Sequence, residues 1–562
     1  MSFLSKVGSK LFIGSEEFKT IGFNYYGALN TSKLTWQKTL AAAQRNQVKL
    51  VRMWCFDFGK PPSDSPGNFR YLDYPLGTNL ISNGSFETDT TGWTLASGYT
   101  RVNETAKDGS YSVKQVTPNG YNSLTSDLIT VTENTNYVLT FWRKMSVLSG
   151  MPPVLFIKNA AGTTIKDAGY SEDTAGLWVR KQVIFNSGAN TQVRMQFVNW
   201  SGNAVGYFDK IHLGVQSAPT LTWREDTLKQ LDMIVDEAGK KNIKLQLVFA
   251  DNTPNYDTKK TYVDWANTVY GAGISPAYPY VGFYENSYCK QMYKDFLAGI
   301  LGRVNTINGK TYNSDDTIAV LELGNELRVD RSEGANVNTI NSENLTLLSK
   351  SGGWIDEMST YIKTIDSNHL VASSSCSHGY QWVSGDSVFN GTFYGVDYNI
   401  IATLPNVDIL SFHCYPTQGG GELQLLKYGQ KLGHPDAISG DGFKDQLRDY
   451  VRACEENGKV AEMGEVGLIK EAKPSIEHYP LWPRHVFFQQ IFRDWYDCGG
   501  SIMLIWSATT GVTGGSYSVV LEGVTDLIQN MDDRPLMSLI QRRNYSFRGD
   551  AVPIVDDYGI DI

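Results

Sequence analysis

Near its N-terminus the chain contains the segment Val48-Lys49-Leu50-Val51-Arg52-Met53-Trp54. A short, mostly apolar run of this kind is typical of a strand in a parallel sheet whose faces are both covered. Arg52 places a charge inside the run. Because a buried charge is costly unless it is paired, we expect Arg52 to have a partner elsewhere in the chain.

Seven further segments predict strands of the same kind. They are Ile21–Asn24, Ile243–Phe249, Thr317–Leu323, Leu370–Ser373, Val407–Phe412, Lys459–Met463 and Ser501–Trp506. Helices are expected between them, because apolar residues recur there at helical spacing, for example at Leu228, Leu231, Ile234, Val235 and Ala238, at Met292, Phe296 and Ile300, and at Phe443, Leu447, Tyr450, Val451 and Cys454. We expect Thr222 and Glu225 to form a capping box at the start of the first of these helices.

Eight strands that alternate with helices predict an α/β fold, a (β/α)8 TIM barrel. A doubly wound open sheet is the alternative. It is less favoured because the turn after Ile21–Asn24 lacks a Gly-rich phosphate-binding pattern.

The stretch between residues 79 and 215 has a different composition, rich in Gly, Thr, Ser and Asn, with short alternating segments and no helical pattern. This pattern predicts a β-sandwich of the jelly-roll kind. We therefore expect a first part of the barrel at residues 1–78, an inserted sandwich at 79–215 and the second part of the barrel at 216–562. An insertion after strand two would stand beside the C-terminal face of the barrel, where active sites are built.

Composition narrows the class of partner. The chain has 562 residues and a formal net charge of −9, which argues against nucleic acid and against an anionic membrane surface. Six cysteines without CxxC spacing predict buried thiols rather than a zinc site. No membrane span or secretory leader is visible, so we leave localisation open and expect extracellular action only after leader removal or lysis. Aromatic residues make up 12% of the chain, which suits a core or a sugar-stacking surface.

Two carboxylates follow predicted strands on opposite sides of the barrel mouth. Glu326 lies in Leu323-Gly324-Asn325-Glu326 after strand four, and Glu465 lies in Gly464-Glu465-Val466-Gly467 after strand seven. Two facing carboxylates about 5–5.5 Å apart are what retaining glycoside hydrolysis requires. Glu462 is the alternative to Glu465, but it lies earlier, within the strand itself.

The barrel segments resemble glycoside hydrolase family 5, and its endo-β-1,4-mannanase branch most closely. The resemblance rests on an ordered set of motifs: Gly22-Phe23-Asn24-Tyr25-Tyr26, Val51-Arg52-Met53-Trp54, Leu323-Gly324-Asn325-Glu326, Asp366-Ser367-Asn368-His369-Leu370, Phe412-His413-Cys414-Tyr415-Pro416, Gly464-Glu465-Val466-Gly467 and Ile505-Trp506. It implies a retaining endo-β-glycanase that acts on a polysaccharide, β-1,4-mannan or glucomannan, without a cofactor for catalysis. A β-glucanase, another β-glycosidase acting on an exopolysaccharide, and a non-catalytic carbohydrate-binding or adhesion protein are the alternatives. The oligomeric state is left open.

The resemblance also implies roles for individual residues. Glu326 would be the general acid/base and Glu465 the nucleophile. The other expected site residues are Arg52 and Tyr415 as donors to Glu465, Asn325 as the contact of the sugar 2-hydroxyl, His413 at the substrate or the acid/base, Trp506 as the stacking platform, and Tyr26, Trp54 and His378 as lining residues.

Two segments depart from the mannanase pattern. After strand three the chain has Phe249-Ala250-Asp251-Asn252-Thr253-Pro254 where the branch usually has Asn-Asn-Trp, and after strand five it has Ser375-Cys376-Ser377-His378-Gly379-Tyr380 where a Gly-Glu-Gly-like turn is usual. Both segments lie where sugar subsites form, so they leave the sugar preference open.

The inserted stretch resembles the jelly-roll carbohydrate-binding modules of families 4, 9 and 22. The resemblance is carried by Asn83-Gly84-Ser85-Phe86-Glu87 and Gly206-Tyr207-Phe208-Asp209. It implies a structural calcium ion for which Glu87 and Asp209 could supply oxygen ligands. Candidate sugar platforms in the module are Trp93, Tyr121, Trp142, Trp178 and Trp200.

Overall fold

Eight parallel strands close into a barrel in the computed structural model, which describes residues 2–57, 68–75, 77–117, 121–150, 153–170, 174, 176–199, 202–252, 256, 258–275, 279–329, 341–374, 394–414, 442–467, 484–509, 519–520, 537 and 539–547. The barrel strands are β4 (Thr20–Asn24), β5 (Leu50–Trp54), β19 (Lys244–Val248), β20 (Ile318–Glu322), β21 (Leu370–Ser374), β22 (Ile409–Cys414), β23 (Val460–Val466) and β24 (Ile502–Ile505). Each pairs with the next along the chain, and β24 pairs with β4. The predicted TIM barrel is confirmed, and a doubly wound open sheet is excluded because the sheet is closed.

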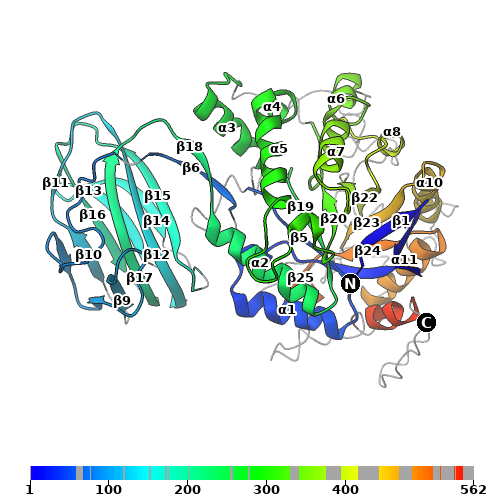
Figure 1. Ribbon diagram of the computed structural model, residues 1–562, viewed down its shortest axis with the longest axis horizontal. Helices are drawn as coiled ribbons and strands as arrows, with labels where there is room; N and C mark the ends of the chain where they lie inside the picture. Colours follow the sequence, from blue (N-terminus) through cyan, green and yellow to red (C-terminus); the bar gives the residue numbers. More distant parts are fainter. Residues whose placement is uncertain are drawn as a thin grey trace, which may run out of the picture.

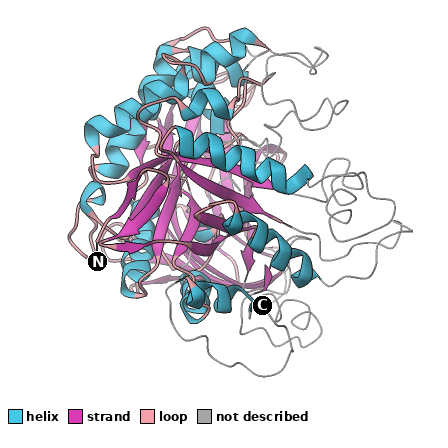
Figure 2. Ribbon diagram, turned by 90° about the vertical axis from the view of Figure 1, so that its right-hand side faces the viewer, coloured by secondary structure: helices cyan, strands magenta, loops and turns pink. Residues whose placement is uncertain are grey.

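Helices surround the strands on the outside of the barrel (Figure 2). They are α1 (Lys33–Arg45), α2 (Glu225–Lys240), α3 (Thr258–Tyr270), α4 (Pro279–Glu285), α5 (Ser287–Leu301), α6 (Ser342–Leu348), α7 (Trp354–Ile365), α8 (Tyr398–Ala402), α10 (Gly442–Glu456) and α11 (Arg484–Asp497), with short 3-10 helices η1 (Ala28–Asn30) and η2 (Tyr312–Ser314). The predicted apolar faces point inward: Met292, Phe296 and Ile300 of α5 are buried. No helix in the described part of the chain is long and apolar enough to cross a bilayer.

The predicted capping box is wrong. Thr222 lies in strand β18 (Thr220–Trp223), where it pairs with Tyr71, and Arg224 is the N-cap of α2 without a side-chain cap. Pairing with β6 (Arg70–Asp73) therefore takes precedence over a local cap. Glu225 instead accepts hydrogen bonds from Arg303.

A small antiparallel sheet packs at one end of the barrel. It consists of β1 (Leu4–Val7), β2 (Lys10–Ile13) and β3 (Glu16–Glu17). Its apolar residues Leu4 and Leu11, with Phe18, form one buried cluster with barrel residues such as Leu50 and Val320. The barrel interior is therefore apolar at this end. A short parallel pair, β25 (Ala508–Thr509) and β26 (Val519–Val520), follows the last barrel strand.

Two antiparallel sheets form a sandwich beside the barrel, inserted after its second strand (Figure 1). One sheet has the order β14-β13-β16-β10-β7, with β11 paired to β16, and the other has the order β15-β12-β17-β9-β8. The strands are β7 (Trp93–Leu95), β8 (Tyr99–Val102), β9 (Ser112–Thr117), β10 (Asn122–Ser126), β11 (Ile129–Thr130), β12 (Asn136–Gly150), β13 (Val154–Asn159), β14 (Thr164–Tyr170), β15 (Val179–Asn186), β16 (Gln192–Asn199) and β17 (Gly202–Val215). The apolar core between the two sheets includes Phe141, Phe197 and Phe208, so the inserted β fold is confirmed.

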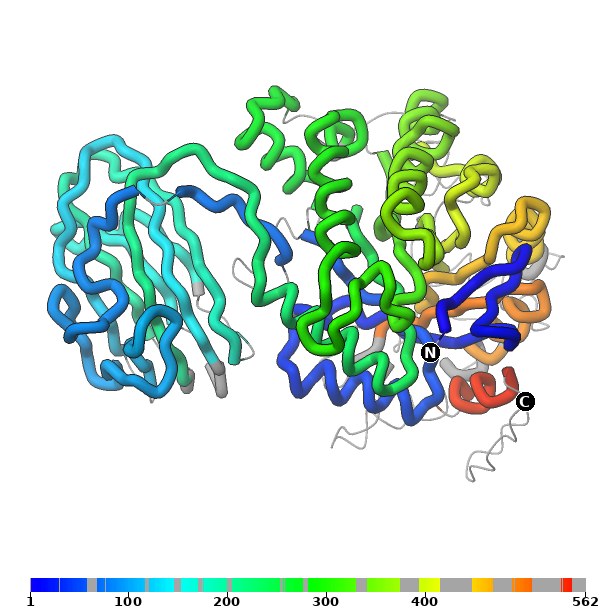
Figure 3. The backbone as a smooth tube through the Cα atoms, in the orientation of Figure 1, coloured from blue at the N-terminus to red at the C-terminus, as the bar shows by residue number. Residues whose placement is uncertain are grey.

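The chain enters and leaves the sandwich along a two-stranded ribbon, β6 paired with β18 (Figure 3). On the barrel side, the buried Arg70 donates to Asp57, to the hydroxyl of Tyr262 and to the carbonyl of Met292. Its guanidinium also lies 5.6 Å from the ring of Trp223 and 4.9 Å from that of Phe296, within cation–π range.

On the sandwich side, strand β15 contacts the ribbon through two side chains. Arg180 Nη1 donates to the hydroxyl of Tyr71 at 2.9 Å and to Asp73 Oδ1 at 2.7 Å. The side-chain amide of Gln182 donates to the carbonyl of Leu72 and accepts a hydrogen bond from the backbone N–H of Tyr74, just after β6. The ribbon thus has specific contacts with both parts of the molecule.

The Arg70 contacts predict a large stabilising role. Replacing Arg70 with Met leaves Asp57 buried without its counter-charge, so the free energy of unfolding should fall by about 3–5 kcal/mol. Denaturant unfolding measures this change. Lys260→Met, which removes an exposed pair with Asp264 on α3, is the control and should change little. Equal effects of the two variants would contradict the prediction.

Candidate active site

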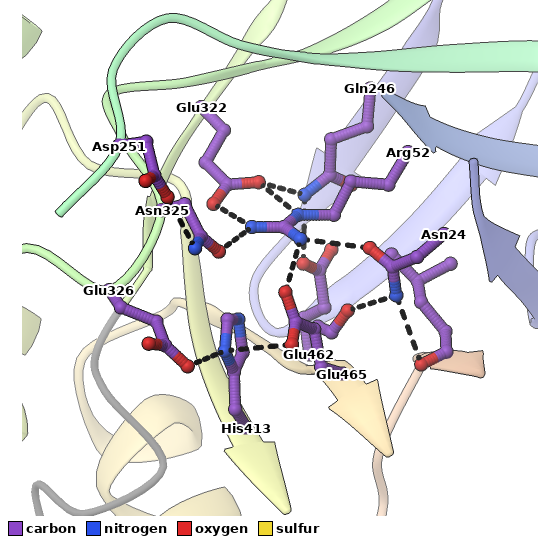
Figure 4. Close-up of polar contacts among 12 residues, drawn as sticks. Asn24, Arg52, Gln246, Asp251, Glu322, Asn325, Glu326, His413, Glu462 and Glu465 are labelled. Atoms are coloured by element: carbon purple, nitrogen blue, oxygen red, sulfur yellow. Dashed lines mark hydrogen bonds and ion pairs between the residues drawn. The ribbon is translucent and has the colours of Figure 1, made fainter. Parts of the chain in front are cut away.

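The side chain of Arg52 lies fully buried inside the barrel, at the centre of a polar network (Figure 4). Its closest partner is Glu322 of β20, which accepts from Nε at 2.6 Å and from Nη2 at 2.7 Å. This two-pronged pairing is the geometry that guanidinium and carboxylate groups favour. Burial alone would lower the pKa of Arg52, but the charges of Glu322 and Glu465 outweigh it and hold that pKa above its ordinary value.

The three remaining N–H groups of Arg52 also have acceptors. Nη1 donates to Asn24 Oδ1 at 2.8 Å and to Glu465 Oε1 at 2.9 Å, and Nη2 donates to Asn325 Oδ1 at 2.8 Å. A guanidinium has five N–H donors, and all five are used here. The position of each acceptor is therefore coupled to the others through one rigid, planar group.

Glu326 and Glu465 converge on the ring of His413. His413 Nδ1 lies 2.8 Å from Glu326 Oε1 and 3.4 Å from Glu465 Oε2. One oxygen of each carboxylate and one ring nitrogen lie within 4.8 Å of one another. Burial would lower the pKa of His413, but the charges of Glu465 and Glu326 and the hydrogen bond to Glu326 raise it above its usual value.

The backbone at Glu326 has an unusual conformation. Its φ is +50°, a left-handed conformation that is uncommon for residues other than glycine. Strain of this kind persists where the surrounding structure fixes it, often at functional positions. Next to it, Asn325 Nδ2 donates to Asp251 Oδ1 at 2.8 Å, so the amide of Asn325 is held at both ends.

A further buried carboxyl, that of Glu462, joins the network through Gln246. Gln246 Nε2 donates to Glu322 Oε2 and to Glu462 Oε1, both at 2.9 Å. Burial and the neighbouring charge of Glu322 raise the pKa of Glu462 to about 7. Glu462 therefore faces Gln246 rather than His413, which distinguishes it from Glu465.

Aromatic side chains line one side of the network. The rings of Tyr26 and Trp506 are stacked, with centroids 5.0 Å apart and an interplanar angle of 14°. Trp54 lies 5.8 Å from Trp506, and the Arg52 guanidinium is 4.8 Å from the Trp54 ring. Trp54 is buried, whereas Tyr26 is 37% exposed and Trp506 is partly exposed, so the latter two present apolar surface to a ligand.

The structure brings most of the predicted site residues together. They are Tyr26, Arg52, Trp54, Asn325, Glu326, His413, Glu465 and Trp506. His378 and Tyr415 lie outside the described residues.

Sequence reasoning missed four members of the network: Asn24, Gln246, Asp251 and Glu322. The sequence held a signal for Asn24 and Gln246: each is a polar residue inside an otherwise apolar barrel strand, at a position that pairs with Arg52 in the sheet. Asn24 pairs with Arg52 in the sheet register, and Arg52 pairs with Gln246.

Both predicted calcium ligands of the sandwich accept hydrogen bonds from backbone N–H groups. Glu87 accepts backbone N–H groups of Ser110 and Tyr111, and Asp209 accepts those of Lys107, Asp108 and Lys210. The calcium ion stays a prediction. Among the described residues, the one cluster of three side chains able to ligate a metal is Glu326, His413 and Glu465.

Comparisons with known proteins point to one group of enzymes. The profile of a family described as GH family 5 beta-mannosidase-like matches residues 186–493. Mannan endo-1,4-beta-mannosidase 1 of Arabidopsis thaliana is 29% identical over 333 residues, which cover 56% of this chain and 71% of that protein. Mannan endo-1,4-beta-mannosidase 1 of Oryza sativa subsp. japonica is 32% identical over 201 residues, 35% of this chain and 42% of that protein.

A solved structure supports the fold. The endo-beta-1,4-mannanase from Thermotoga petrophila superposes with a TM-score of 0.51 at 18% identity, covering 96% of this chain and 79% of that chain. At this identity the likeness concerns the fold alone.

The raised pKa of Glu462 predicts a pH-dependent stability. The folded protein keeps a proton on Glu462 up to about pH 7, whereas the unfolded chain releases it near the ordinary value of 4.5. Stability should therefore fall as the pH rises between these values. Glu462→Gln removes this loss, so relative to wild type it should gain up to about 3 kcal/mol between pH 4 and pH 8.

Denaturant unfolding at several pH values measures this difference. Glu456→Gln, at an exposed position of α10, is the control and should follow wild type. A constant difference between Glu462→Gln and wild type across the range would contradict the prediction.

Proposed function

Because the chain belongs to the GH family 5 beta-mannosidase-like family, we propose that it is a retaining endo-β-1,4-mannanase that cleaves mannan or glucomannan. The curated relatives that match it carry the name mannan endo-1,4-beta-mannosidase, which supports this substrate class. The observation that carries the proposal is the convergence of Glu326 and Glu465 on His413. Two carboxylates at such close range suit double displacement, which retains the anomeric configuration.

The proposed mechanism assigns one step to each carboxylate. Glu465 attacks the anomeric carbon and forms a glycosyl ester as the bond to the leaving oxygen breaks. Glu326 gives that oxygen its proton. Glu326 then takes a proton from a water molecule, whose oxygen displaces Glu465 and releases the sugar. Neither step requires a cofactor.

The surrounding contacts support these roles. The N–H of Arg52 on Glu465 Oε1 favours the charged, nucleophilic form of that carboxylate. Asn325 Nδ2 carries two N–H groups, and Asp251 takes one of them. The second can donate to the sugar 2-hydroxyl, a contact that strengthens in the transition state. Trp506 and Tyr26 offer a stacking surface for the pyranose ring.

The two carboxylates can be tested separately. Glu465→Ala should lower kcat on mannan by on the order of 10⁴-fold. Glu326→Ala should fail on mannan but still release dinitrophenol from dinitrophenyl β-mannobioside in a rapid burst, because this leaving group needs no proton. Reducing-end assays on mannan, glucomannan, cellulose and xylan measure the first effect, and stopped-flow absorbance measures the second.

Three outcomes would contradict the proposal. Release of reducing ends from cellulose but not from mannan would indicate a β-glucanase. Binding to polysaccharide with no release from any substrate would indicate a non-catalytic protein. An α-configured first product, followed by NMR, would exclude retention.

We further propose that the inserted sandwich, residues 79–215, is a carbohydrate-binding module. The outer face of the sheet β15-β12-β17-β9-β8 presents partly exposed aromatic side chains: Trp142, Trp178 and Tyr207. The rings of Trp178 and Tyr207 lie 6.4 Å apart, and hydrogen bonds hold both, from Trp178 to Thr105 and from Tyr207 to Glu104. Trp93 is buried in the sandwich core, and Trp200 lies outside the described residues.

Substitution of the module's aromatic face tests this proposal. Trp178→Ala should weaken binding to mannan several-fold and slow its turnover, and should leave hydrolysis of mannotetraose unchanged, because each stacked sugar contributes to polymer binding only. Affinity electrophoresis and kinetics on both substrates measure these effects. Tyr288→Ala, at an exposed aromatic residue of α5 outside the module, is the matched control and should leave polymer binding unchanged. Unchanged polymer binding in Trp178→Ala would contradict the proposal.

A further inference from the structure

Glu322 is a fully buried carboxylate to which the mechanism assigns no part. It comes from β20, four residues before Glu326, and both of its oxygens face the Arg52 guanidinium. Arg52 therefore gives Glu322 two N–H groups and gives Glu465 one. A buried charge pair is costly to desolvate, so its presence beneath a proposed active site calls for a functional reason.

Glu322 is itself held in place from the neighbouring strand. Gln246 of β19 donates to Glu322 Oε2, on the side opposite Glu465, and its amide also reaches Glu462. Figure 4 shows the resulting cluster, in which Glu322 and Gln246 lie on one side of the Arg52 guanidinium and Glu462 and Glu465 on the other. The cluster draws on strands β5, β19, β20 and β23.

We propose that Glu322 is a positioning residue that fixes the fork of Arg52, and that Gln246 in turn fixes Glu322. The inference rests on the proposed function, because it assumes that Glu465 is the nucleophile. Glu322 accepts the N–H of Nε and one N–H of Nη2. Arg52 can therefore donate only one N–H, from Nη1, to Glu465 Oε1. Glu465 Oε2 then lies on the side of His413 and Glu326, where the proposed reaction takes place.

Loss of the Glu322 charge would change how the N–H groups of Arg52 are shared between Glu322 and Glu465. The Arg52 fork could turn and take both oxygens of Glu465 in a two-pronged pair, which stabilises the carboxylate and weakens it as a nucleophile. Among the described residues, the charged and titratable groups around Glu465 are Arg52 on β5, Glu322 on β20, Glu326 after β20, His413 on β22, Glu462 on β23 and the phenol of Tyr256. Asn24 and Gln246 face the network from β4 and β19 without charge.

The test is Glu322→Gln, which keeps the size of the side chain and removes its charge. We expect kcat on mannan to fall by roughly 10- to 100-fold with little change in KM, because a displaced nucleophile affects the reaction more than binding. We also expect the acid limb of the kcat/KM profile to move to lower pH by about one unit, because Arg52 then stabilises charged Glu465 alone. Glu322→Asp, which restores the charge, should recover the wild-type acid limb.

Asp232→Asn is the matched control. Asp232 also forms a buried two-pronged pair with an arginine, Arg303, but on α2 outside the barrel. Its loss should lower the thermal stability and leave the pH profile as in wild type. If Glu322→Gln matches Asp232→Asn in both properties, Glu322 has only a structural role and the inference is wrong.

Two further measurements separate the remaining outcomes. If Glu322→Gln does not fold, Gln246→Met, which keeps the side-chain length, should shift the acid limb in the same direction by less, and no shift would overturn the inference. If wild type cleaves no β-glycan, or Glu465→Ala retains activity, the proposed function fails. A wild type that depends on Glu465 but not on the charge of Glu322 would overturn the inference alone.

Discussion

A single buried guanidinium organises the polar end of this barrel. Arg52 has five acceptor contacts on four residues, and these residues belong to β4, β20, the turn after β20 and β23. Desolvation of an arginine costs several kcal/mol, which only well-aligned acceptors can offset. The strands that carry these acceptors are consequently held in a fixed relation to β5. Both proposed catalytic carboxylates depend on that relation, Glu465 directly and Glu326 through the turn that begins with Asn325.

The barrel interior is divided along its axis into two chemically different parts. At one end the small sheet of β1, β2 and β3 closes over an apolar cluster that includes Leu50. Two positions further along the same strand, Arg52 begins the polar network. The carboxylates next to this apolar cluster are almost entirely removed from water, because Glu322 and Glu462 are fully buried and Glu465 is 3% exposed. This arrangement strengthens the electrostatic interactions among them.

The sequence allowed the barrel strands, the inserted sandwich and most of the polar site to be predicted. Apolar runs of strand length carry their own signal, and Glu326 and Glu465 follow such runs directly. The capping box failed because the partner of Thr222 is Tyr71, about 150 residues away in the chain, and local propensity does not reveal such pairings.

Glu322 was overlooked for a related reason. A glutamate inside an apolar strand looks like an exception until the closed barrel brings its side chain to Arg52, although β19 separates their two strands. The partner of Arg52 was therefore predicted as Glu465, although Glu322 is the closer of the two. The sandwich aromatics posed a different difficulty, because alternation along a strand does not tell which face becomes the core: Trp93 packs inward, whereas Trp142 lies on the outer face.

The paired ribbon of β6 and β18 has a consequence for how such a protein could have been assembled. Asp73 and Thr220 are direct neighbours in the antiparallel register, so the chain leaves for the sandwich and returns at almost the same point. A tight two-residue turn can join such a pair. The barrel could therefore exist with a simple hairpin at this position. The insertion then resembles a cassette that recombination can add, remove or exchange without breaking the sheet that carries the chemistry.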